Sequence, residues 1–154
     1  MLEIEMLESH EIHRAAKIFL RDGFVAVKNV LVGDQFNQTK DASEKVIHEI
    51  IDQDPEHVGN RGHHRYSFGN QMRHLEWCQL TDLPAVLPIL SAIWKSNEFI
   101  CAGNGGDFSL PGAEIQPLHS DGNDLGFLDP FGQTTTRDLP PSLICVNFLM
   151  IDFN

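Results

Sequence analysis

Gln116-Pro117-Leu118-His119-Ser120-Asp121 is the stretch that decides both the fold and the chemistry expected of this chain. On an extended segment, residues i and i+2 point to the same side, so His119 and Asp121 can reach one metal ion together. Such a pair supplies two of the three ligands in the 2-His-1-carboxylate site for non-haem Fe(II), whose opposite face stays open. The alternative is a surface histidine beside an acid. No histidine follows His119 in the sequence.

Sequence of β type lies on both sides of this pair. Residues 107–110 and 98–102 are candidate strands, with a Gly-rich turn at 103–106 between them. Beyond the pair, residues 122–141 form an irregular segment rich in Gly, Pro, Thr and Asp. The apolar run 142–153 then predicts the strongest strand of the chain.

The first half of the chain predicts helices instead. Ser9 can cap a helix over residues 9–22, and residues 24–27 then indicate a strand. Further helices are predicted over residues 34–53 and 83–94. Because helices come first and strands later, without regular alternation, the pattern indicates an α+β fold in a single domain of residues 1–154.

Residues 56–74 predict a long loop with one short strand over residues 65–68, because glycines, histidines and arginines mix there without a visible period. Four histidines of this loop are either a second metal group or solvated and substrate-facing side chains: His57, His63, His64 and His74. Arg65 and Arg73 either hold an anion or brace the loop. Asn70 is a candidate substrate contact. Asn147, inside the last apolar run, is either part of a buried amide network or a residue of the pocket.

Charge and cysteine content narrow the class of protein. Eleven Lys and Arg against 22 Asp and Glu give a formal charge of −11, which repels phosphate backbones and anionic lipid. We therefore expect neither nucleic acid nor a membrane surface as a partner. Three widely spaced cysteines, at 78, 101 and 145, predict neither a disulfide framework nor a zinc site. Buried, reduced thiols in a cytoplasmic protein are expected, since no secretory signal or apolar span is visible.

Four stretches together resemble the phytanoyl-CoA dioxygenase family of Fe(II)/2-oxoglutarate-dependent oxygenases. Residues 21–27, followed by Val30 and Leu31, are similar to that family's opening helix-to-strand segment. Residues 65–69 resemble a stretch found in its members, and residues 110–121 resemble the approach to its iron site. Residues 145–153 look like the next core strand. The resemblance spans most of this chain but only the N-terminal portion of a usual family member.

The resemblance implies a double-stranded β-helix, also called a jelly roll or cupin-like fold, flanked by N-terminal helices. It implies Fe(II) bound by His119 and Asp121, and 2-oxoglutarate as co-substrate beside Gln116. Separately from the resemblance, their places in the sequence make Asn147 a candidate co-substrate residue and Arg65 and Asn70 candidate substrate residues. The implied reaction oxidises a C–H bond of a small organic molecule or secondary metabolite with O2.

Two residues implied by the resemblance have no counterpart in these 154 residues: a distal histidine ligand and an arginine that pairs with the far carboxylate of 2-oxoglutarate. The jelly roll is therefore expected to be incomplete at its C-terminus. We expect an N-terminal portion of an enzyme, one part of a two-chain enzyme, or a non-catalytic binding or interaction protein. A second chain or a second copy would then cover the open sheet edge. A jelly-roll protein that uses another metal is the remaining alternative.

Overall fold

The structure is a computed structural model that describes residues 4–119, 121, 131, 133 and 139–151. The chain divides into two compact units, Met1–Glu114 and Ile115–Asn154. The described secondary structure consists of helices and two two-stranded sheets, all in the first unit. This mixture of helix and sheet does not test the expected jelly roll, which stays a prediction.

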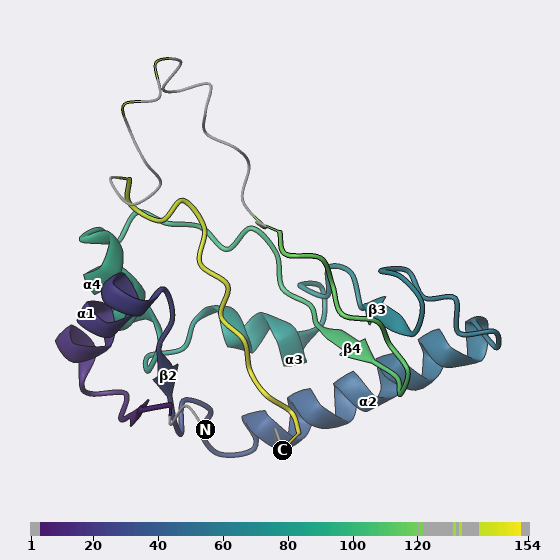
Figure 1. Cartoon of the computed structure of the whole chain (residues 1–154). Coiled ribbons are helices and arrows are strands. Elements are labelled where there is room, and N and C mark those ends of the chain that lie inside the picture. Colours follow the sequence, from purple (N-terminus) through teal and green to yellow (C-terminus); the bar gives the residue numbers. More distant parts are fainter. Residues whose placement is uncertain (1–3, 120, 122–130, 132, 134–138, 152–154) are drawn as a thin grey trace. The chain divides into compact units, whose positions relative to one another are not determined.

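Helices α1 (Ile12–Asp22) and α4 (Leu87–Trp94) pack against each other (Figure 1). Their facing residues are buried: Ala15, Ala16, Ile89 and Ile93. Two adjacent alanines let α4 come close to the backbone of α1. Helix α1 also connects β1 (Met6–Leu7) to β2 (Ala26–Val27), and these two strands pair in parallel.

The long helix α2 (Gln35–Gln53) meets the short helix α3 (Leu75–Cys78) through polar contacts. The buried residues of α2 are Thr39 and Ser43, and the Thr39 hydroxyl donates to the Glu76 carbonyl at 3.2 Å. A 3-10 turn, η1 (Gln79–Thr81), follows α3 directly. Helix α3 and η1 were absent from the sequence prediction.

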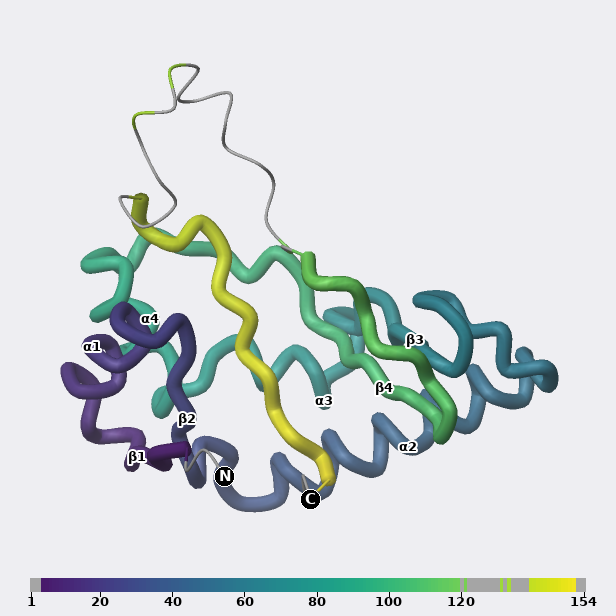
Figure 2. The backbone as a smooth tube through the Cα atoms, viewed as in Figure 1, coloured from purple at the N-terminus to yellow at the C-terminus, as the bar shows by residue number. Residues whose placement is uncertain are grey.

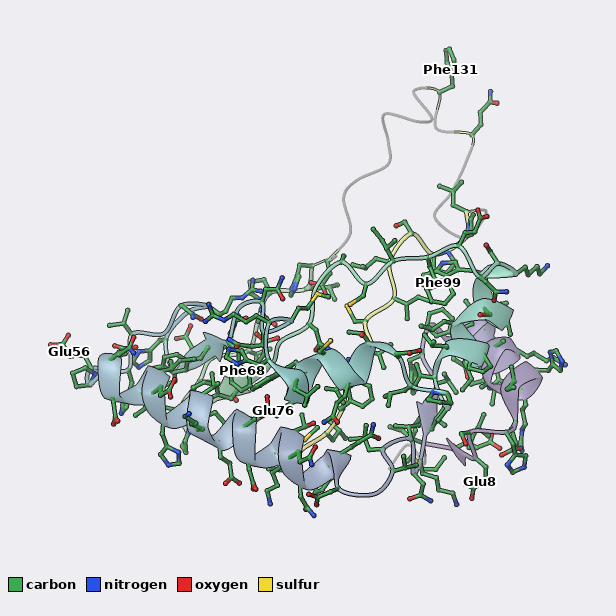
Figure 3. All side chains as sticks on the ribbon, turned by 180° about the vertical axis from the view of Figure 1, so that it is seen from behind. Glu8, Glu56, Phe68, Glu76, Phe99 and Phe131 are labelled. Atoms are coloured by element: carbon green, nitrogen blue, oxygen red, sulfur yellow. The ribbon has the colours of Figure 1, made fainter. Side chains whose placement is uncertain are left out.

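Strands β3 (Arg65–Ser67) and β4 (Asp107–Ser109) form an antiparallel pair that presents an aromatic face. Tyr66 lies opposite Phe108, and their rings stack with centroids 4.7 Å apart. Phe68 (Figure 3) continues this cluster. The Trp77 ring meets the Phe68 ring edge-on, with centroids 6.2 Å apart. Tyr66 and Trp77 are each only 2% exposed, so this cluster is a core of the first unit.

Residues 98–106 differ from the predicted strand and turn. They contain no strand, and the carbonyls of Asn104 and Gly106 accept hydrogen bonds from the main-chain N–H groups of Gln71 and Phe68. The Trp77 indole N–H donates to the Gly105 carbonyl at 3.1 Å, and a Cβ on Gly105 would lie 2.1 Å from the Gly69 carbonyl oxygen. Gly105 of the predicted turn therefore allows close backbone contact with Gly69.

The predicted strand over 142–153 is also wrong for its described part. Residues 142–151 have no strand pairing with described residues, and residues 152–153 lie outside the description. Apolar side chains of this segment are exposed: Leu149 is 62% and Ile151 is 75% accessible. A strand needs a partner as well as β-type residues, and none of the described residues supplies one.

Several smaller expectations are corrected. Glu11, not Ser9, precedes α1, and its carboxylate accepts from the Glu8 main-chain N–H at 3.0 Å. Helix α4 begins at Leu87, four residues later than predicted. The cysteines are free, as expected, but all three are exposed: Cys78, Cys101 and Cys145.

Candidate metal centre

The two predicted metal ligands lie together in the second unit. His119 Nε2 is 3.2 Å from Asp121 Oδ1, and the two side chains are 49% and 70% exposed. The segment that leads to them, residues 113–119, is not a strand, so the regular alternation behind the prediction does not apply there. The side chains nevertheless meet.

The hydrogen bond of the other ring nitrogen of His119 determines which tautomer the imidazole adopts. Nδ1 lies 2.7 Å from the Pro117 carbonyl oxygen. A carbonyl can only accept, so Nδ1 carries a proton and donates it. In the neutral imidazole, Nε2 then keeps its lone pair and can bind a metal ion.

The spacing fits two adjacent ligands of one metal ion. Two ligands with metal bonds of about 2.1 Å at a right angle lie about 3.0 Å apart. The observed 3.2 Å separation agrees with that geometry. Metal-binding histidines usually donate their second N–H to a carbonyl or carboxylate, as His119 donates to Pro117. The donor set therefore suits a divalent metal ion.

A third protein ligand is not found among the described residues. No group of three or more His, Cys, Asp or Glu side chains that could hold a metal occurs within residues 4–119, 121, 131, 133 and 139–151. That search includes the four histidines of the loop, for which a second metal group was one of two alternatives, and it finds no such group in this part of the chain. Asp152, a possible internal third ligand, lies outside the description.

The predicted co-substrate residues are both exposed. Gln116 precedes Pro117 and is open to solvent. Asn147 is exposed too, so the expectation of a buried amide is wrong. The assignment of Gln116 to 2-oxoglutarate depends on the sequence resemblance alone, and that of Asn147 depends on its position in the apolar run.

The predicted substrate residues belong to the first unit. Asn70 is exposed, and its side-chain oxygen accepts from the Met72 main-chain N–H at 3.0 Å, which makes a local turn. Arg65 is half-buried in β3. Arg73 Nε donates to His74 Nε2 at 3.1 Å, so these two side chains pair with each other.

A residue that the sequence prediction missed organises the loop before β3. Asp54, at the end of α2, accepts hydrogen bonds from the main-chain N–H groups of Val58 and Gly59 and from the Tyr66 hydroxyl, at 3.2, 2.8 and 2.8 Å. Glu56 lies at this end of the helix, where the loop begins (Figure 3). The Asp54-Pro55 dipeptide directly after a long helical pattern was the available signal for such a turn.

Hydrogen bonding and burial shift the pKa values of this pair in opposite directions. The Gly59 N–H, followed by the Tyr66 hydroxyl and the Val58 N–H, holds the pKa of Asp54 below its ordinary value. Burial, assisted by the Asp54 carboxylate, raises the pKa of Tyr66. Asp54 is therefore ionised and Tyr66 neutral at pH 7.

No helix in the described part of the chain is both long enough and apolar enough to cross a membrane. Comparison with protein-family models, with curated proteins and with solved structures finds no match to this chain.

Proposed function

We propose that this chain carries two of the iron ligands of an Fe(II)/2-oxoglutarate-dependent dioxygenase of the phytanoyl-CoA dioxygenase type. The observation that supports it most is the His119–Asp121 pair, with Nε2 and Oδ1 at 3.2 Å and Nδ1 anchored on the Pro117 carbonyl. The resemblance of residues 110–121 to the family's iron-site approach is the second support. A distal histidine, absent from these 154 residues, would complete the ligand set.

Each residue of the pair has a defined task in this proposal. The Pro117 carbonyl holds the imidazole in the tautomer whose Nε2 can bind a metal, and Asp121 supplies the negative charge. The high exposure of both side chains leaves one side of the site open to O2 and to a small organic substrate. Bound Fe(II) would supply the oxygen chemistry by which 2-oxoglutarate becomes succinate while a substrate C–H bond is oxidised.

Metal titration tests the proposal without requiring turnover. Co²⁺, monitored by its visible absorption, should bind the chain at a single site. His119→Ala or Asp121→Ala should weaken binding by at least about tenfold, because loss of a ligand costs no less than loss of a residue that orients one.

His48→Ala is the matched control. His48 is an exposed histidine whose Nδ1 also meets a main-chain carbonyl, that of Glu44, at 2.7 Å. The His48→Ala variant should bind Co²⁺ with the same affinity as the unaltered chain. Unchanged affinity in His119→Ala, or an equal loss in His48→Ala, would contradict the assignment.

A second candidate function is a non-catalytic binding or interaction protein, or one part of a two-chain enzyme. It is favoured by the exposed apolar residues Leu149 and Ile151 and by the presence of only two clustered ligands among the described residues. Titration with 2-oxoglutarate in the presence of Co²⁺ separates the two. Saturable binding supports the dioxygenase, and its absence together with concentration-dependent association supports the interaction protein.

A further inference from the structure

Residues 57–65, which we name the His/Arg loop, form a local concentration of positive and imidazole groups in an acidic protein. Five of its nine residues are His or Arg, and no Asp or Glu occurs from His57 to Leu75, although the whole chain has a charge of −11. Figure 2 follows this segment from the end of α2 to β3. A solvated face of this protein would be expected to carry acids as well.

Hydrogen bonds of Asp54, Asn60 and main-chain groups order the loop, and none of those formed among the described residues involves the guanidinium of Arg61 or Arg65. Asp54 accepts two of the loop's N–H groups, and the Arg61 N–H donates to the Arg65 carbonyl at 3.1 Å. The Asn60 side chain bonds both the N–H and the carbonyl of Ser67. Gly59 is packed so closely that a Cβ would lie 2.2 Å from the Gly62 carbonyl oxygen.

The imidazoles of the loop are gathered by the same packing. The His63 and His64 ring centroids are 4.0 Å apart, and the His57 ring meets His64 edge-on at 5.7 Å. His64 Nδ1 donates to the Pro111 carbonyl at 2.6 Å. His57 Nδ1 is buried and has no hydrogen-bond partner among the described residues.

The loop has hydrogen-bond donors that lack acceptors among the described residues. Within the described residues, the guanidinium groups of Arg61 and Arg65 have no carboxylate within ion-pair distance. The successive main-chain N–H groups of Gly62 and His63 are likewise without a hydrogen-bond acceptor in that part of the chain. Adjacent unpaired donors of this kind favour a ligand that brings several acceptor oxygens and negative charge.

We propose that the His/Arg loop is a binding site for a small oxyanion, the phosphate or carboxylate group of a ligand. Arg61 and Arg65 supply the charge, since guanidinium groups bind both kinds of oxyanion through paired N–H donors. Asp54 and Glu56 are the nearest acids along the chain, and Asp107 is the nearest acid on the paired strand β4. The Asp54 oxygens already accept hydrogen bonds from the loop and from the Tyr66 hydroxyl. The proposal is independent of the metal pair, which belongs to the other unit.

Titration of the whole ¹⁵N-labelled chain, without metal, tests this site. Inorganic phosphate at pH 7.5 should give saturable amide shifts confined to residues 57–65 and their neighbours. Acetate is the second probe. Saturation by phosphate alone identifies a phosphate-bearing ligand, and saturation by both extends the site to carboxylates. No saturable shift with either probe overturns the proposal.

The variant Arg61→Gln/Arg65→Gln should weaken phosphate binding by at least about tenfold, because charge-assisted hydrogen bonds are lost. Lys17→Gln/Lys45→Gln removes the same net charge from exposed helix positions and should leave the affinity unchanged. An equal loss in both double variants means that only net charge matters and contradicts the proposal. If the first variant is misfolded by circular dichroism, Arg61→Gln alone, at an exposed residue, provides the measurement.

Discussion

Gly59→Ala should be far more destabilising than Gly23→Ala, although both glycines have left-handed backbone conformations. Their φ angles are +77° and +83°, so alanine at either position costs about 1–2 kcal/mol for the conformation alone. At Gly23, the C-cap of α1, no atom lies within 4 Å of the added methyl group. Gly23→Ala should therefore cost little beyond this conformational term.

At Gly59, the methyl carbon would lie 2.2 Å from the Gly62 carbonyl oxygen and 2.5 Å from that of Arg65. Both neighbours are backbone atoms, so relief requires the whole loop to shift. Overpacking of this kind adds about 1–3 kcal/mol, which gives a total of about 2–5 kcal/mol for Gly59→Ala.

Urea unfolding followed by circular dichroism compares the two variants. With an m-value of about 1–3 kcal/mol per molar urea, their difference should move the midpoint by about 1 M. Gly59→Ala should also lose phosphate affinity, because the overlap displaces the turn that carries Arg61 and Arg65. Equal destabilisation by the two substitutions would refute the packing described for the His/Arg loop.

Three further predictions concern pH, turnover and association. The Asp54 pKa is lowered by folding, so the contribution of Asp54 to stability is present above the unfolded-state pKa of about 3.9 and is lost as pH falls. Asp54→Asn should therefore flatten the dependence of the unfolding free energy on pH between about 5 and 3. An unchanged slope would contradict this role of Asp54. The 154-residue chain alone, with Fe(II), ascorbate and 2-oxoglutarate, should release little or no succinate. The described residues bring only two of the expected ligands together, and the distal histidine and the arginine clamp that the resemblance implies have no counterpart in the sequence. Robust release that disappears in His119→Ala would contradict this. Leu149→Ser/Ile151→Ser should reduce self-association measured by light scattering, because these residues belong to one segment with four exposed apolar side chains, at 143, 146, 149 and 151. The control Ile100→Ser, at a residue that is 89% exposed outside that segment, should have no such effect. An equal reduction in the control would argue against a role for this segment.

The long helices could be predicted from the sequence because their apolar positions recur over several turns. Helix α2 begins within one residue of the predicted start and ends at Gln53 as predicted. Helix α3 is too short for any period to be visible. It is held by distant groups: the Asn104 side chain donates to the Trp77 carbonyl at 2.6 Å, and Thr39 bonds Glu76. No local pattern could have indicated those partners.

The apolar run after residue 142 was predicted to be a strand from its residue types, and that prediction failed for its described part. β-branched and aromatic residues describe a surface that suits a sheet, but pairing depends on another segment of chain.

At the metal pair, the His-x-Asp spacing predicted the meeting of two side chains. The donation from His119 to the Pro117 carbonyl depends on a rotamer and a bend, which spacing alone does not contain.

Asp54 has a consequence for how this region opens to solvent. One carboxylate joins the last turn of α2, the first residues of the His/Arg loop and the buried hydroxyl of β3. Fraying of the helix end would release all three acceptor bonds in one event. The Val58 and Gly59 amides should then exchange their hydrogens at the rate set by α2, although both lie outside any helix or strand. The loop and the helix end therefore behave as one cooperative unit.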